Sequence, residues 1–167
     1  MVEFAFVLPL VLLLVVGLIE FGKAFNYWLS LNDVASEGAR WAAVDLVPAY
    51  PPELEQASNS PTVDELKGYV LSRIGSSELL ALVEENENNI QICYEPSPGS
   101  TVPNLPAAGD AAMVKVSASY DLGVIGRVVS LFSSDSSDFG EVTLTGTSWT
   151  RLEQAPSAAD PQWTQCP

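Results

Sequence analysis

The feature that most constrains the fold of this chain is an uninterrupted apolar run over residues 4–19. The run has sixteen residues and includes no charged, hydroxyl or amide side chain. As an α-helix with a rise of about 1.5 Å per residue, it would span roughly 24 Å, slightly less than the hydrocarbon core of a bilayer at about 30 Å. Continuing the helix through Phe25 would bring it to the interface. The run therefore predicts a helix whose surface must be covered by lipid or by other copies of the same chain.

The charged residue before the apolar run is acidic, whereas an ordinary signal peptide or signal anchor has a basic residue there. Signal peptides and signal anchors begin with Lys or Arg, whereas here the preceding charged residue is Glu3. We expect either that a leader has been removed or that something other than basic flanks sets the orientation. An unpaired carboxylate at the edge of hydrocarbon is unfavourable unless a cation meets it, and the nearest cation is an amino-terminal amine.

The same helix is predicted to continue well beyond the apolar run, with apolar side chains on one arc and polar ones on the other. The apolar positions are Ala24, Trp28, Leu31 and Ala35, and the polar ones are Asn32, Asp33, Glu37 and Arg40. Pro9 lies in the first turns, where it removes few hydrogen bonds, so it should bend the helix without ending it. The helix should end within residues 44–47, because Pro48 cannot continue it.

Two pairs of opposite charges lie three residues apart on this helix, Glu20 with Lys23 and Glu37 with Arg40. Residues at this spacing are neighbours on a helix surface and can form internal ion pairs. The alternative for both is a bridge between adjacent subunits.

The rest of the chain predicts a small α+β head. The division is an amino-terminal helix over residues 1–46, a Pro-rich linker over 47–61 and a head over 62–167. Capping residues and apolar spacing predict two short helices in the head, over residues 62–74 and 77–85, with Gly75 closing the first. Alternating apolar residues predict antiparallel strands over residues 90–94, 112–120 and 141–150. About three strands with helices on one face make an α+β domain.

A short apolar segment lies between the last two predicted strands. Its apolar residues are Val124, Ile125, Val128, Val129, Leu131 and Phe132. We interpret it as a core-facing helix, with the alternative that it packs on the membrane or on a neighbouring subunit.

Composition excludes several classes of function. The chain has 167 residues, of which 21 are acidic and 7 basic, so its surface repels nucleic acid and we exclude nucleic-acid binding. It has no histidine, no GxSxG motif, no phosphate-binding glycine loop and no redox motif, so it predicts neither an enzyme nor a cofactor. Asp135 and Asp138 do not have the spacing of an EF-hand loop, so no metal site is predicted.

The two cysteines, Cys93 and Cys166, are far apart in the sequence. Without histidine or a CxxC motif they do not form a plausible zinc site. If the head lies outside the cytoplasm, they should form a disulfide that ties the carboxy-terminal tail to an early strand. The alternative is two free buried thiols.

Several residues of the amino-terminal segment occur at the same relative positions as in a known protein family. They are Glu3, Phe4, Pro9, Glu20, Phe21, Gly22, Ala24, Glu37, Gly38, Ala39 and Arg40. With these residues the segment resembles TadE-like proteins, pilin-class subunits of tight-adherence (Tad) pili within the type IV pilus superfamily. The resemblance covers roughly residues 1–45. The acidic residue is usually the fifth of the mature chain in that family and is the third here, which leaves the mature amino terminus open.

The resemblance implies a lollipop-shaped pilin and a set of partners. A prepilin peptidase removes a short basic leader, the bilayer and inner-membrane assembly machinery hold the precursor, and copies of the chain then pack their helices into a helical filament at the cell surface. The expected function is a non-catalytic filament subunit for surface adhesion. The alternative is a membrane-anchored minor pseudopilin or accessory component of a Tad pilus or secretion machine.

Candidate site residues follow from this interpretation. Glu3 is expected to pair with the amino-terminal amine of an adjacent subunit, so the assembly contact comprises Met1, Glu3 and Phe4. The residues expected in the membrane and then in the filament core are Val7, Leu8, Pro9, Leu12, Val15, Ile19, Glu20, Lys23 and Trp28.

Overall fold

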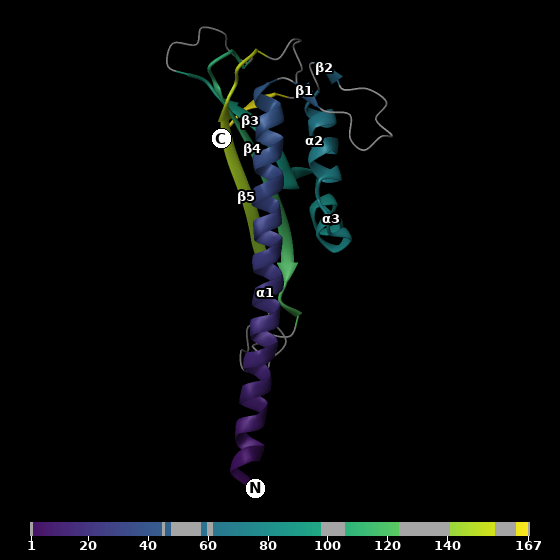
Figure 1. Ribbon diagram of the computed structural model, residues 1–167, viewed down its shortest axis with the longest axis vertical. Coiled ribbons are helices and arrows are strands. Elements are labelled where there is room, and N and C mark those ends of the chain that lie inside the picture. Colours follow the sequence, from purple (N-terminus) through teal and green to yellow (C-terminus); the bar gives the residue numbers. More distant parts are fainter. Residues whose placement is uncertain are drawn as a thin grey trace.

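The computed structural model describes residues 2–44, 46–47, 58–59, 62–97, 106–123, 141–155 and 163–166. Its dominant element is a single helix of 42 residues, α1 (Val2–Ala43). The carboxy-terminal half of α1 runs through the head, and its amino-terminal half projects beyond the head as a rod (Figure 1). The α+β class and the lollipop shape predicted from the sequence are therefore confirmed. The apolar segment of residues 124–132 and the acidic loop after it lie outside the described residues.

The helix α1 continues through Pro9 and ends at Ala43, one residue before the predicted range. Pro9 is the eighth residue of α1, so it removes one internal backbone hydrogen bond, and the remaining hydrogen bonds carry the helix past it. Two short strands follow, β1 (Leu46–Val47) and β2 (Ser58–Asn59), which pair antiparallel at the two ends of the segment predicted as a linker. The chain from the far end of the sheet also meets α1 here, because the Glu153 N–H donates a 2.8 Å hydrogen bond to the Ala43 carbonyl.

Two short helices follow, α2 (Val63–Ser72) and α3 (Ser77–Glu84), and then a single 3-10 turn, η1 (Glu87–Asn89). The predicted capping box is present, with the Thr62 hydroxyl accepting from Glu65 N–H and the Glu65 carboxylate accepting from Thr62 N–H. The helix α2 ends before the predicted boundary, with Arg73 as its C-cap, so Gly75 is not the closing residue.

The sheet has four strands where three were predicted. They are β3 (Ile90–Glu95), β4 (Ala111–Asp121), β5 (Glu141–Arg151) and β6 (Thr164–Gln165), in the order β5-β4-β3-β6. The three predicted strands pair antiparallel, but β6 runs parallel to β3, so the sheet is mixed. Two residues are too few to show an alternating pattern, which is why β6 could not be predicted.

The disulfide predicted between Cys93 and Cys166 is confirmed, with a Cα–Cα distance of 5.1 Å. It joins β3 to the residue that follows β6. Beside it the Cys166 N–H donates a 2.9 Å hydrogen bond to the Tyr94 carbonyl. The disulfide and this hydrogen bond together hold the short parallel strand against β3.

All three helices pack on one face of the sheet, as predicted. The even-numbered residues of β4 point to this face, because Ala112, Val114, Val116 and Ala118 are fully buried. The stripe of α1 that meets them includes Tyr27, Leu31, Val34, Ala35, Ala39 and Ala42. Trp28, which was predicted on the apolar arc, is 41% exposed. The buried stripe passes through Tyr27 instead, since one position along a helix turns a side chain by about 100°.

Candidate functional site

The projecting half of α1 is a surface with almost no protein cover. Phe4, Leu10 and Leu18 keep 70%, 69% and 64% of their surface exposed. Among the described residues α1 is the one helix apolar and long enough to cross a membrane, and its most apolar 18-residue stretch has a mean hydropathy of 2.2 with none of it buried. A core helix of a soluble domain would be mostly buried. This surface therefore needs cover from outside the monomer.

The predicted site residues that the structure describes fall into two groups, one on the rod and one where α1 enters the head. Seven side chains lie exposed on the projecting rod or just above it: Phe4, Val7, Leu8, Pro9, Leu12, Val15 and Ile19. Glu20 is half-buried, and Lys23 and Trp28 lie where α1 enters the head. Met1 and the Glu3 side chain lie outside the described residues, although the backbone of Glu3 belongs to α1.

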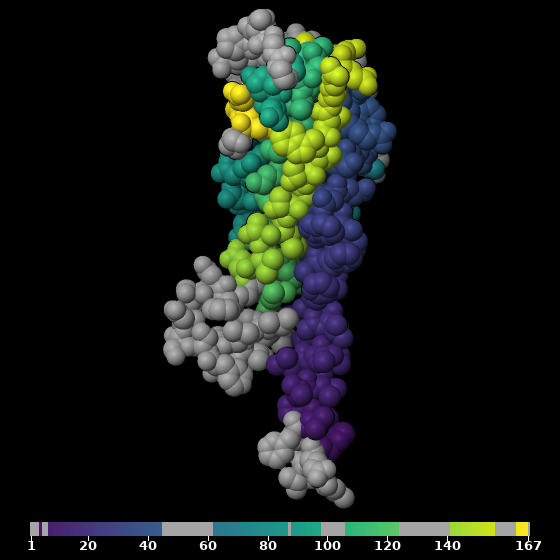
Figure 2. Space-filling model, turned by 90° about the vertical axis from the view of Figure 1, so that its left-hand side faces the viewer, coloured from purple at the N-terminus to yellow at the C-terminus, as the bar shows by residue number. Residues whose placement is uncertain are grey.

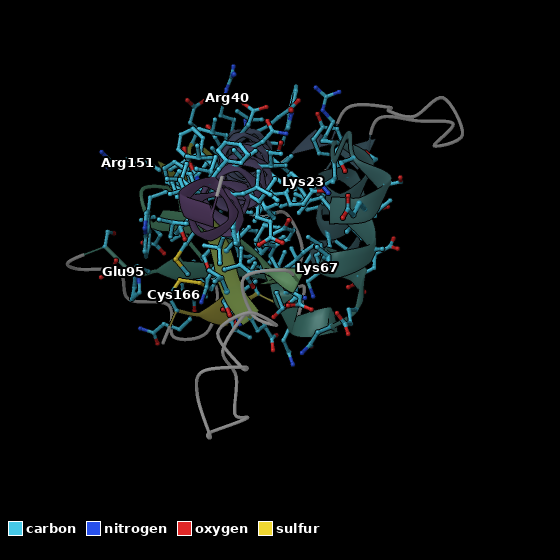
Figure 3. The ribbon with its side chains drawn as sticks, turned by 90° about the horizontal axis from the view of Figure 1, so that it is seen from below. Lys23, Arg40, Lys67, Glu95, Arg151 and Cys166 are labelled. Carbon is cyan, nitrogen blue, oxygen red and sulfur yellow. A yellow bond between two sulfur atoms is a disulfide. The ribbon has the colours of Figure 1, made fainter. Side chains whose placement is uncertain are left out.

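At the level where α1 enters the head, a small polar cluster links α1 to α3. The Tyr27 hydroxyl donates to the Glu78 carboxylate, and Lys23 Nζ lies 3.7 Å from the same Oε2 atom. Figure 3 shows Lys23 on the side of α1 that faces the two short helices. The hydrogen bond from Tyr27 and the charge of Lys23 lower the pKa of Glu78. Sequence reasoning weighed only Glu20 and other subunits as partners of Lys23.

One turn below the end of α1, a second polar cluster links it to α2. Glu37 accepts a 2.7 Å hydrogen bond from the Tyr69 hydroxyl and a 2.9 Å hydrogen bond from Arg73 Nε. Burial of Tyr69, together with this hydrogen bond to Glu37, raises the pKa of the phenol. The prediction that offered Arg40 as the partner of Glu37 was wrong about the observed pairing, because Arg40 points away from the head (Figure 3). Glu37 thus serves to hold α2.

The strength of this link can be measured with a double-mutant cycle. A hydrogen bond to a charged group contributes about 1.5 kcal/mol or more, so Tyr69→Phe should lower the free energy of unfolding by about that amount. Combined with Glu37→Gln, the two changes should show a coupling of about 1 kcal/mol in thermal or urea unfolding of the full chain in detergent micelles. Strictly additive effects would contradict a direct contribution of this pair.

The residues after Glu37 let α1 approach the head closely. A Cβ on Gly38 would lie 2.7 Å from Val70 Cγ2 and 3.4 Å from Val114 Cγ1, so any larger residue here would force Val70 of α2 to move. Ala39 is completely buried beside it. The segment that the family resemblance singled out is therefore, in this chain, a docking surface for its own head.

At Gly146 of β5, the backbone of α1 comes very close to the sheet. A Cβ there would lie well under 3.0 Å from the backbone of Leu31 and Asn32, a separation that real Cβ atoms essentially never show. Sequence reasoning missed this residue. The available signal was a single glycine on the core-facing side of a strand, which marks a place where another backbone comes close.

A buried carboxylate, also missed, organises the far end of the head. Asp110 is completely buried and accepts 2.8 Å hydrogen bonds from the N–H groups of Ser97 and Ala107. Its own carbonyl accepts from Leu152 N–H, and its neighbour Gly109 (φ +100°) donates to the Leu152 carbonyl. Burial alone would raise the pKa of Asp110, but the two backbone hydrogen bonds outweigh it and lower the pKa. Asp110 therefore acts as a structural clamp.

Within the described residues, no three His, Cys, Asp or Glu side chains gather where they could hold a metal ion. The polar clusters that the structure does show join elements of the head to one another or to α1. They help to fix how these elements pack against one another.

Comparison with known proteins agrees with this geometry over the amino-terminal segment. Residues 1–40 match the family model described as TadE-like protein. No curated protein and no solved structure matches the chain. The matched residues cover the exposed rod and the part of α1 that packs against the head, up to Arg40. They end before the first residue of the sheet. Over its amino-terminal 40 residues the chain is therefore similar to the TadE-like protein family.

Proposed function

We propose that this chain is a non-catalytic structural subunit of an extracellular type IV-like (Tad) pilus, which polymerises through α1 and serves surface adhesion. The observation that carries the proposal is the continuity of α1: an uncovered apolar rod and a helix embedded in the head are one element of 42 residues. Figure 2 shows the rod leaving the head without a break. The TadE-like match over residues 1–40 supports the same function.

Rigid attachment of the head favours a filament over a simple anchor. An anchor needs only enough apolar residues to span lipid, and a flexible linker can follow it. Here the apolar half is fixed to the head by the close packing at Gly38 and Gly146 and by the Glu37 cluster. In a filament every copy must present its head at one height and angle, and a rigid helix provides this.

Glu3 supplies the direction of assembly in this proposal. Leaving lipid for a helix bundle gives little net hydrophobic gain, because lipid is as apolar as the helices. A carboxylate near the tip of α1 that meets a cation only in the assembled state adds a specific driving force, strengthened by the dry surroundings. The amino-terminal amine of an adjacent copy is the cation we propose, with Met1 and Phe4 completing the contact.

The bilayer would hold a precursor pool in the cytoplasmic membrane, where a prepilin peptidase and the assembly machinery act on it. The second candidate is a minor pseudopilin or accessory component of the same machine, which the size of the head favours, since roughly 120 residues follow α1. Mass spectrometry of the chief band from sheared surface filaments separates the two. A major subunit should be the protein in that band, whereas a minor subunit should be detected only in trace amounts.

Replacing Glu3 tests the assembly contact. In a host that carries the pilus machinery, Glu3→Ala should leave the chain in the membrane fraction and reduce the yield of sheared filaments at least tenfold. The loss follows because the substitution removes the carboxylate that the proposed assembled state pairs with an amino-terminal amine. Membrane fractionation and immunoblotting of sheared filaments measure the two results separately.

Glu95→Ala is the matched control, since Glu95 lies exposed at the end of β3, and Figure 3 shows it to one side of α1. It should change neither measurement. An unchanged filament yield in Glu3→Ala would remove Glu3 from the mechanism, and absence of the chain from wild-type filaments would refute the filament function itself.

A further inference from the structure

Where α1 enters the head, the structure contains a groove of about 350 Å³ whose described lining residues are all apolar. One wall is formed by residues of α1. The other is formed by the residue that follows β4 and by the first residues of β5. The described lining residues are Phe21, Ala24, Phe25, Trp28, Leu122, Val142 and Leu144. The groove therefore lies at the junction of the rod and the head.

The aromatic wall of the groove is ordered but poorly covered. The rings of Phe21 and Phe25 stack with centroids 6.3 Å apart, and those of Phe25 and Trp28 lie 5.8 Å apart. Phe21 is nevertheless 68% exposed, and Val142 on the opposite wall is 40% exposed. The exposed apolar surface of the rod thus continues up into the groove, and both need cover once the chain leaves lipid.

We propose that this groove receives the apolar rod, residues 4–19, of a second copy of the chain. The inference rests on the proposed filament function and names the surface of the head that takes part in it. The occupant is indicated by the molecule itself, because an uncovered apolar helix and an uncovered apolar groove lie on one chain and neither has a partner among the described residues.

The relative position of the two surfaces predicts the type of assembly. The middle of the rod is near Leu12 and the middle of the groove is near Phe25, thirteen positions higher on the same helix. Under the proposed function all copies start from one membrane with their heads on the same side, so the occupying helix runs in the same direction as α1. At about 1.5 Å per residue, that copy must be displaced by roughly 20 Å along α1. The contact uses two different surfaces and repeats at every step, so it is heterologous and builds an open filament rather than a closed dimer.

Engineered cysteines test the contact in assembled filaments. Leu12→Cys combined with Val142→Cys in one chain cannot close within that chain, because a disulfide requires Cα atoms about 4.4–6.8 Å apart and these sites are roughly 20 Å apart. Mild oxidation should give a ladder of dimers, trimers and longer products on nonreducing gels. The native cysteines do not interfere, because Cys93 and Cys166 are bonded to each other.

Leu12→Cys with Trp149→Cys is the control, since Trp149 is 51% exposed on the opposite face of the sheet. It should give no ladder. Filaments that form without cross-linking of the Leu12 and Val142 pair, or that cross-link equally through Trp149, overturn this inference and leave the filament function standing. Products that stop at the dimer overturn the heterologous geometry. If the unmodified chain enters no filament, the function and the inference fail together.

Discussion

Gly146→Ala should destabilise the head by about 3 kcal/mol or more, although it adds a single methyl group. The added Cβ would meet the backbone of Leu31 and Asn32 at a distance that requires one of the two elements to move. Overpacking a well-packed site costs about 1–3 kcal/mol even when side chains can adjust, and here the obstacle is helix backbone. Thermal unfolding of the full chain in detergent micelles, followed by near-UV circular dichroism, measures the loss.

The same substitution at Gly68 is a matched control. Gly68 lies in α2, and a Cβ there meets nothing within 4 Å. Alanine in an exposed helix position is favoured over glycine by about 1 kcal/mol, so Gly68→Ala should stabilise slightly. If Gly146→Ala unfolds at the temperature of the wild type, the tight approach of α1 to β5 does not hold the head, and the rigid coupling argued above would lose its main support.

The sequence predicted most of the elements because their patterns are local. An apolar run, a capping box and alternating strands each depend on residues within one element, and the observed bounds of α2, α3, β3, β4 and β5 differ from the expected ones by a few residues at most. The disulfide was predicted because the sequence contains only two cysteines. In contrast, β6 has only two residues, and its place depends on a distant part of the chain, because the next residue, Cys166, is bonded to Cys93 of β3.

The partners of charged residues could not be predicted, because they depend on how elements pack. Glu37 has an opposite charge three residues away on its own helix, yet it pairs with Arg73, 36 residues later. An ion pair on one helix is worth only a few tenths of a kcal/mol, so the hydrogen bonds that Tyr69 and Arg73 donate to Glu37 from a packed neighbour outweigh it. Asp110 gave no signal at all, since a single aspartate before a strand is usually a surface turn residue.

Under the proposed filament function, these packing details would bear on assembly as well as on stability. The Glu37 cluster, Gly38 and Gly146 fix α1 to three different elements, α2, β4 and β5. The direction of the rod relative to the head is thereby determined before any copy meets another. The groove between rod and head exists only while that direction is kept, so a variant that loosens the head should also lose filament contacts.

Asp110→Ala should have the second large effect on stability, a loss of about 3 kcal/mol at neutral pH. The substitution removes two hydrogen bonds of 2.8 Å to a charged acceptor and leaves the N–H groups of Ser97 and Ala107 without it. Each such bond contributes about 1.5–3 kcal/mol. Asp121→Ala is the control, because Asp121 is exposed at the end of β4 and should change the free energy of unfolding by less than about 0.5 kcal/mol.

The contribution of Asp110 to the free energy of unfolding should also decrease as the pH falls. The folded state lowers the pKa of Asp110 below its ordinary value of 3.8. This means that the folded state stabilises the ionised carboxylate more than the protonated carboxyl. The contribution is complete above 3.8 and is lost as the pH falls through the lower folded-state pKa. The gap in unfolding free energy between wild type and Asp110→Ala should therefore narrow in acid. A gap that stays constant or widens there would mean that the carboxylate charge does not hold the two N–H groups.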